Sequence, residues 1–234
     1  MTTLHRETDA ERGRGDDGMT LIELVVAMGI FGILLTLVVS MFVSSSRSFS
    51  DQSGALDNSR MASTSMNEVT RIIRAGTEIP RPNSADNRPV FTHAGAEKID
   101  MHSFIDAGNS VDPAPVRVEL QRNANNELVE TRWEGYHDVP AYWEFRSTSN
   151  YARTIARSLM PADTSAPLFR YYDKNGAILT PPAGGTLTLA QRRNIASVRV
   201  SMQVQADASG RVEPVQIQNM VGLPNLGVAR VDVH

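Results

Sequence analysis

The chain has 234 residues and no cysteine, so disulfides cannot stabilise it and side-chain packing must do so. Its net charge is −3, and Lys98 and Lys174 are its only lysines, which says little about partners. The sequence also contains no HExxH, GxSxG or P-loop pattern. We therefore expect a protein that is not an enzyme, with no catalytic residue, no bound metal and no cofactor.

One group of candidate metal ligands comprises His93, Asp100, His102 and Asp106. Their spacing matches no standard ligand pattern, so we interpret them as surface residues of a loop-rich stretch. Residues 173–176 resemble the start of a calcium loop, but the Glu needed at its twelfth position is missing. We interpret this second segment as a turn.

The strongest feature is an apolar run at residues 24–43, which contains no charge and only Thr36 and Ser40 as polar side chains. Twenty helical residues at about 1.5 Å each span roughly 30 Å, the thickness of a bilayer core. A secretory signal peptide would have a shorter apolar run and a small-residue cleavage site, and none follows here. The run therefore predicts a retained transmembrane helix.

A single carboxylate, Glu23, stands at the start of this run. A carboxylate one turn inside a membrane helix costs about 3 kcal/mol and usually needs a partner. Glu23 can be an interfacial residue that reaches the headgroups, or half of a capping box with Thr20. It can also be a charge that pairs with a cation.

Residues 18–30, GMTLIELVVAMGI, resemble the class III signal of type IV pilins and type II secretion pseudopilins. The resemblance rests on Gly18, an apolar Met19 after it, Glu23 at the fifth mature position and the apolar span. It implies cleavage after Gly18 by a prepilin peptidase on the cytoplasmic side, and N-methylation of Met19. It also implies that Glu23 neutralises the terminal amine of an adjacent subunit during filament assembly.

Two features depart from the family pattern. Asp16 and Asp17 precede the cleavage position, where leaders of the family are usually basic. Acidic residues weigh little in the positive-inside rule, so Arg12 and Arg14 can still hold the leader in the cytoplasm. Met19 replaces the commoner Phe. The first departure affects the expected efficiency of cleavage, and neither changes the class of protein.

Beyond the membrane segment, Ala62, Met66, Val69 and Ile73 form one apolar stripe at helical spacing. We expect this stripe to pack against a globular sheet, and Gly76 to end the helix. Residues 44–65 are rich in Ser, Asp, Gln and Asn, which favours a bend or local melting there.

The remainder predicts β-structure, and the whole chain predicts an α+β fold with a long N-terminal helix on an antiparallel sheet. Residues 80–89 are expected to be a loop, and residues 151–159 fit either a helix or a strand. The expected strands are residues 116–121 with 128–133 and 169–172 with 177–179, as two hairpins, then 195–204 and 215–221.

These observations divide the chain into four parts: a cytoplasmic leader at 1–18, a transmembrane and assembly segment at 19–43, an amphipathic continuation at 44–76 and an exported β-rich domain at 77–234. The membrane-facing residues include Leu24, Phe31, Leu37 and Val43. The C-terminal domain is expected outside the cytoplasmic membrane, and the assembled protein in a cell-surface filament.

The resemblance implies a structural filament subunit, and the size of the globular part favours a minor pilin. Its expected partners are the prepilin peptidase and methyltransferase, other pilin or pseudopilin subunits, and an assembly platform protein with its ATPase. A second, pattern-level resemblance of residues 166–173 to J-type pseudopilins keeps a type II secretion pseudopilin as an alternative.

A DNA-uptake pilin and a membrane-tethered domain each fit part of the sequence. A DNA-uptake pilin would use a basic patch, and the only basic concentration comprises Arg71, Arg74, Arg81 and Arg88. Acidic residues interrupt it, so an ordinary solvated face is the simpler interpretation. An exported binding domain tethered by its helix would give no reason for the pattern from Gly18 to Glu23.

Overall fold

The computed structural model describes residues 19–82, 84, 86–105, 114–139, 142–205 and 213–224. The leader, including Gly18, lies outside the described residues. The chain divides into two compact units, Met1–Ser50 and Asp51–His234.

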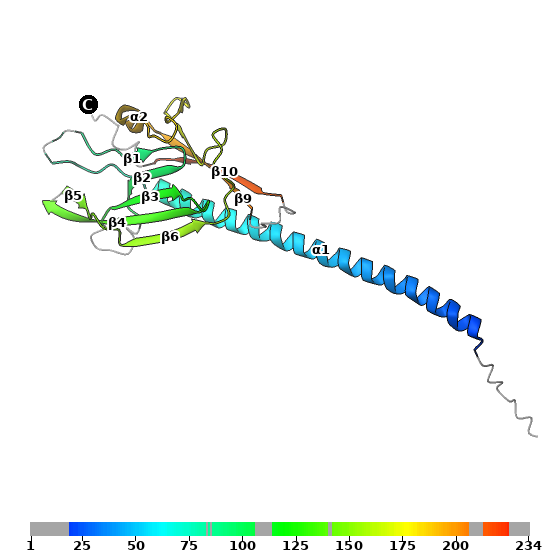
Figure 1. Ribbon diagram of the computed structural model, residues 1–234. Coiled ribbons are helices and arrows are strands. Elements are labelled where there is room, and N and C mark those ends of the chain that lie inside the picture. Colours follow the sequence, from blue (N-terminus) through cyan, green and yellow to red (C-terminus); the bar gives the residue numbers. More distant parts are fainter. Residues whose placement is uncertain are drawn as a thin grey trace, which may run out of the picture. The chain divides into compact units, whose positions relative to one another are not determined.

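Helix α1 runs from Leu21 to Arg74 and contributes residues to both units (Figure 1). Residues 44–65 are helical throughout, so the low helix propensity of this stretch does not interrupt the helix. In the second unit, burial of Asn58, Ala62 and Ser65 on one face of α1 supports the helix against that propensity. Arg71 and Arg74 lie in its last turn, where cations favour the helix dipole.

Gly76 ends the helical segment, as predicted. Its N–H donates to the carbonyl oxygen of Ile73 at 3.0 Å, and the chain then leaves the helix. A Cβ at this position would lie 2.7 Å from Cε of Met101 and 2.9 Å from the carbonyl oxygen of Ile73. Glycine therefore permits a close approach between the helix end and the sheet.

All paired strands of the second unit are antiparallel and form two sheets. The first sheet follows the order β1 (Phe91–Ala94), β2 (Lys98–Ser103), β3 (Val116–Arg122), β4 (Leu128–Val139) and β5 (Tyr142–Phe145), and β6 (Tyr151–Ala156) also pairs with β4. The second sheet follows the order β10 (Val215–Gly222), β9 (Ser197–Val204), β7 (Phe169–Tyr172) and β8 (Ile178–Leu179). A short helix, α2, covers Leu189–Arg193.

One core joins the C-terminal part of α1 to both sheets. The predicted stripe is buried, with Met66 3% exposed and Ala62, Val69 and Ile73 fully covered. The same core contains residues of both sheets, among them Ile99, Met101, Val118, Leu120, Tyr171, Val198 and Val200. Polar contacts add to the packing, since Ser65 donates to the carbonyl oxygen of Ile155 at 2.8 Å. The α+β architecture of long helix and antiparallel sheets is pilin-like, as the sequence predicted.

Both predicted hairpins are present. In the first, Arg122 pairs with Leu128, and the Asn123 side chain accepts from the N–H groups of Asn125 and Glu127 at 2.9 Å each. In the second, the Asp173 carboxylate caps the turn in the same way. The predicted strands near 195–204 and 215–221 are β9 and β10, and the ambiguous segment at 151–159 contains strand β6.

An ion-pair network links α1 to the inner side of the first sheet. Arg153 in β6 contacts both Glu68 of α1 and Glu130 of β4, and its Nε lies 2.7 Å from the Glu130 carboxylate. Glu130 is fully covered and is also paired with Arg132. Arg71 donates from Nη2 to Glu68 at 2.7 Å. Buried carboxylates need such partners, and these ones fix the helix to the sheet.

Candidate processing and assembly site

Thr20 and Glu23 form a capping box at the start of α1. The backbone N–H and the hydroxyl of Thr20 both donate to Oε2 of Glu23 at 2.9 Å. The N–H of Glu23 donates to the Thr20 hydroxyl oxygen at 3.3 Å, and the Leu24 N–H bonds to the Thr20 carbonyl oxygen at 3.1 Å. The helix therefore begins as the capping-box interpretation of Glu23 describes.

The capping box uses only one of the two oxygens of the Glu23 carboxylate. All of its hydrogen bonds go to Oε2, and Oε1 has no partner among the described residues. The side chain is exposed, and the nearest polar neighbour along the helix is Thr20 itself. One oxygen of Glu23 can thus cap the helix while the other accepts a bond from an external cation, so the capping and the charge-pairing interpretations are compatible.

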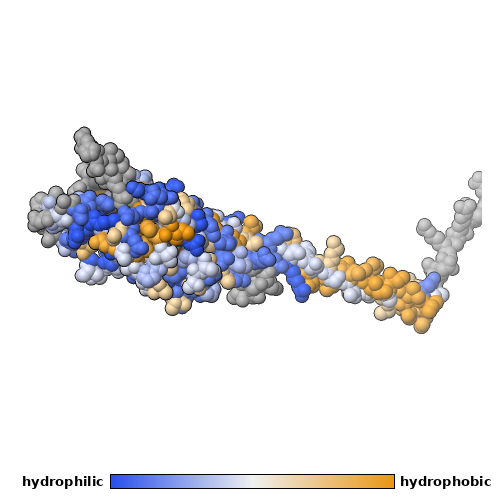
Figure 2. Space-filling view, turned by 90° about the horizontal axis from the view of Figure 1, so that it is seen from above, coloured by the Kyte–Doolittle hydropathy of each residue, from blue (hydrophilic) through white to orange (hydrophobic). Residues whose placement is uncertain are grey.

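The helix that follows presents apolar side chains on every side. Leu24, Phe31, Leu37 and Val43 are between 40% and 66% exposed, and Figure 2 shows the apolar atoms gathered over this part of α1. The two polar residues are satisfied within the helix: Thr36 donates to the Gly32 carbonyl oxygen at 2.8 Å and Ser40 to that of Leu37 at 2.9 Å. Lipid imposes this internal satisfaction on a spanning segment.

Among the described residues, one helix, α1, is long enough and apolar enough to cross a membrane, and it lies near the N-terminus. This suits membrane anchoring. Met19 stands immediately before the N-cap residue Thr20 and is 70% exposed. A cut after Gly18 would leave only Met19 and Thr20 ahead of the helix.

Comparison with known proteins assigns this segment a class. Residues 13–39 match the family described as the prokaryotic N-terminal methylation motif. No curated protein and no solved structure matches the chain. The motif indicates a prepilin substrate of the type IV pilin or pseudopilin type, which implies processing by a prepilin peptidase and assembly with other pilins. Together with the long apolar helix it is consistent with the type IV pilin-like family, a structural and not a catalytic class.

The group of His93, Asp100, His102 and Asp106 contains no metal site among the residues the structure describes, and Asp106 lies outside them. The interpretation as surface residues of a loop is wrong for Asp100 and His102, which are buried in strand β2. His102 stacks on Phe145 with ring centroids 4.9 Å apart, and its Nδ1 lies 3.1 Å from the Pro89 carbonyl oxygen. Burial lowers its pKa to about 4, so the imidazole is neutral near pH 7. Asp100 is paired with Arg117.

The four arginines of the basic concentration have different surroundings. Arg71 is paired with Glu68, and Arg88 with Glu144, so two of the four charges have carboxylate partners. Arg81 has no partner among the described residues and lines a hollow on the first sheet. For Arg71 and Arg88, pairing of this kind favours the interpretation as a solvated face over a phosphate-binding patch.

The segment 166–173 that resembles J-type pseudopilins is largely strand β7. Leu168, Phe169 and Tyr171 are fully covered, and the Tyr171 hydroxyl donates to the Gly95 carbonyl oxygen at 2.7 Å. Burial raises the pKa of this hydroxyl well above its ordinary value. The resemblance there thus rests on residues that serve the core.

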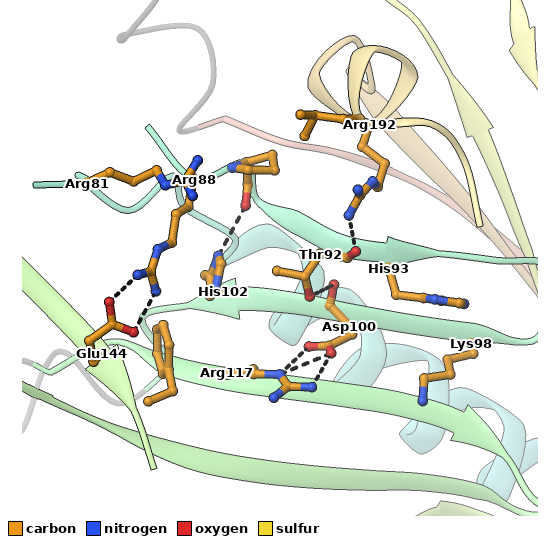
Figure 3. A pocket seen from close by; sticks show the side chains of 13 residues that line it. Arg81, Arg88, Thr92, His93, Lys98, Asp100, His102, Arg117, Glu144 and Arg192 are labelled. Atoms are coloured by element: carbon orange, nitrogen blue, oxygen red, sulfur yellow. Dashed lines mark hydrogen bonds and ion pairs between the residues drawn. The ribbon is translucent and has the colours of Figure 1, made fainter. Parts of the chain in front are cut away.

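A hollow of about 740 Å³ on the first sheet was not predicted from the sequence (Figure 3). Its side chains come from β1, β2, β3, β5, α2 and the segment before β1. Only one local signal was available, the alternation of Lys98, Asp100 and His102 with apolar residues in β2. The other residues are brought together by strand pairing and by α2.

Proposed function

We propose that this protein is a minor pilin, a subunit of a type IV pilus-like filament that is cut after Gly18 and methylated at Met19. The observation that carries the proposal is Oε1 of Glu23, which has no partner among the described residues and lies at the start of an exposed, charge-free helical segment close to Met19. Cleavage creates a cationic amine at Met19, and methylation leaves it cationic. The Glu23 carboxylate of an adjacent subunit is the anion that matches it.

The pairing has an energetic reason. An isolated carboxylate costs about 3 kcal/mol in the membrane, and the terminal amine bears a similar cost. Their attraction is stronger in a low-dielectric helix bundle than in water, so the pair stabilises the assembled state. Apolar burial hardly changes when a helix leaves lipid for other helices, so this charge pair and side-chain packing direct the association.

The minor-pilin assignment is supported by the size of the globular part, which contains two sheets and a short additional helix. In this proposal the leader is cytoplasmic, residues 19–43 cross the cytoplasmic membrane, and residues 77–234 are exported. The partners are a prepilin peptidase and methyltransferase, other pilin subunits, and an assembly platform protein with its ATPase. A type II secretion pseudopilin would share the same N-terminal chemistry.

Filament incorporation tests the proposal. Filaments sheared from cells are collected and probed for this protein and for other pilins, in the wild type and in Gly18→Ala. We expect the protein in the sheared fraction of the wild type and only in membranes for Gly18→Ala. Gly15→Ala changes a leader glycine away from the cut and should behave as the wild type. Retention of wild-type protein in membranes, under conditions where other pilins are sheared off, would refute the assignment to a pilus.

A further inference from the structure

The hollow on the first sheet lies on the face opposite the core. In β2 the side chains of Ile99 and Met101 are fully buried in the core, so alternation places Lys98, Asp100 and His102 on the outer face. His102 is paired in register with Arg117 of β3, which therefore lies on the same face. Figure 3 shows these side chains on the sheet side away from the translucent α1.

Five cationic and two anionic side chains line this hollow. The cations are Arg81, Arg88, Lys98, Arg117 and Arg192, and the carboxylates are Asp100 and Glu144. Such a concentration of positive charge contrasts with a chain whose net charge is −3. Its volume of about 740 Å³ is in the usual range for small-molecule sites.

Three of the five cations are neutralised by carboxylates. Arg117 Nη2 lies 2.6 Å from Asp100 Oδ2, and Lys98 Nζ lies 2.8 Å from Glu119. Arg88 is paired with Glu144 across the opening, with Nη1 3.1 Å from Oε2. These three ion pairs hold the side chains of Arg117, Lys98 and Arg88 in place and contribute no net charge to the hollow.

Arg192 is held differently. Its Nη1 donates to the carbonyl oxygens of Phe91, at 3.3 Å, and Thr92. Its Nε is buried without an acceptor, and its Nη2 has no partner among the described residues. No carboxylate pairs with it there, and burial accordingly lowers its pKa from the ordinary value. Arg192 is thus a fixed guanidinium with an unused donor at the hollow.

Hydrogen bonds hold in place the short helix α2, which contains Arg192. Thr188 and Gln191 form a capping box that starts α2, with the Thr188 hydroxyl 2.9 Å from Oε1 of Gln191. Arg193, the next residue, donates to the Asn87 carbonyl oxygen at 3.1 Å and ties α2 to the segment before β1. The guanidinium is therefore preorganised, which reduces the entropy lost on binding a ligand.

The charges leave a surplus of two. The five cations are opposed by three carboxylates: Asp100 and Glu144 in the lining, and Glu119, the partner of Lys98. The difference is a charge of +2, which Arg192 and Arg81 carry. The two histidines of the hollow add nothing near pH 7, because burial lowers the pKa of both His93 and His102. A dianion is the ligand charge that complements this surplus.

We propose that this hollow binds a phosphate group through Nη2 of Arg192, while Arg81, elsewhere in the lining, supplies the second surplus charge. A phosphate monoester carries a charge of about −1.5 to −2 at pH 7 and offers three acceptor oxygens. Guanidinium groups match such oxygens in geometry as well as in charge. The remaining volume accommodates the group to which the phosphate is attached. This inference concerns the globular domain and does not depend on filament assembly.

Titration calorimetry of the full chain in a phosphate-free, non-ionic detergent tests the site, with inorganic phosphate as the probe at pH 7.5. We expect saturable one-to-one binding, weakened roughly 10- to 100-fold in Arg192→Gln and less in Arg192→Lys. Arg157→Gln is the matched control, because Arg157 is 71% exposed and does not line the hollow. The affinity of the Arg157→Gln variant for phosphate should equal that of the wild type.

Succinate and a short oligonucleotide identify the chemistry. Succinate should bind much more weakly than phosphate, and equal binding would overturn the phosphate assignment. An oligonucleotide that binds and loses affinity in Arg192→Gln would identify the source of the phosphate as a nucleic-acid backbone and support the site. Absence of phosphate binding, or equal binding to the wild type, Arg192→Gln and Arg192→Lys, would overturn the proposal.

Discussion

Glu23 receives two hydrogen bonds from Thr20, both at 2.9 Å and both on the same carboxylate oxygen. The helix start is thereby capped, and the second oxygen remains available to a cation. Charge and cap can be separated experimentally, because the same chain uses Gln191 in place of Glu in the capping box of α2. A Gln at position 23 should therefore keep the cap and remove only the charge.

We predict that Glu23→Gln leaves membrane insertion and leader cleavage intact but lowers incorporation into filaments at least tenfold. The physical reason is the loss of the anion for a neighbour's terminal amine. The measurement is the ratio of sheared to membrane-bound protein. Thr20→Val is the complementary control: it weakens the cap by about 1 kcal/mol and keeps the charge, so it should assemble. Equal assembly of Glu23→Gln and the wild type would exclude the charge-pair role.

Acid should weaken the attachment of α1 to the first sheet through Glu68. Hydrogen bonds from Arg71, then from Arg153, lower the pKa of Glu68 from 4.5 to about 2. A carboxylate with a lowered pKa stabilises the fold above pH 4.5 and loses that contribution as the pH falls towards 2. We expect about 1–2 kcal/mol, after allowance for solvent screening.

The check is the free energy of unfolding between pH 5 and pH 2, by urea titration of the wild type and Glu68→Gln. The difference between the two proteins should shrink across this range. Glu127→Gln is the control variant, because Glu127 is paired at 3.7 Å with Arg157 and not with a residue of α1. A constant difference for Glu68→Gln would show that the ion pairs carry no stabilising charge interaction.

His102 should give a pH dependence in a different range. Burial lowers its pKa from 6.5 to about 4, so the unfolded chain binds the proton more readily. Stability should therefore fall as the pH drops from 6.5 to 4 and then level off, by up to about 3 kcal/mol. In His102→Gln the free energy of unfolding should change less between pH 6.5 and pH 4 than it does in the wild type. Unfolding free energies measured at intervals from pH 7 to pH 4 provide the test, and an unchanged slope in the variant would assign the dependence to other groups.

Gly76→Ala should destabilise the globular unit by about 1–3 kcal/mol, because the added Cβ would meet Met101 and the Ile73 carbonyl oxygen at less than 3 Å. Gly222 has nothing within 4 Å of the corresponding position, so Gly222→Ala is the matched control. Thermal unfolding of both variants measures the difference. Similar melting temperatures for the two would mean that the helix end can shift at little cost.

The features that sequence reasoning predicted are those with local patterns. The helical spacing of the stripe that includes Met66 and Val69 predicts that the stripe is buried. Turn residues such as Asn123 and Asp173 predict the hairpins. The motif around Glu23 is equally local. Its capping partner Thr20 could be named from spacing alone.

The features that were missed depend on contacts between distant segments. Strands β1, β2 and β5 were not predicted, because short strands with polar outer faces carry little pattern of their own. Helix α2, five residues long, was also not predicted. The proposed phosphate site was missed for the same reason. Arg192 reaches the hollow because its α2 segment bonds to β1, and no spacing in the sequence relates Arg192 to Asp100.

The most direct test of the central claim is the intact mass and N-terminal sequence of the protein isolated from native membranes, with Gly18→Ala alongside. The account predicts a mature chain that begins at Met19 and carries one added methyl group on its amine. In Gly18→Ala the leader should remain attached, and Met19 should carry no added methyl group. A wild-type protein that retains its leader would contradict the account and favour a domain that is merely tethered to the membrane.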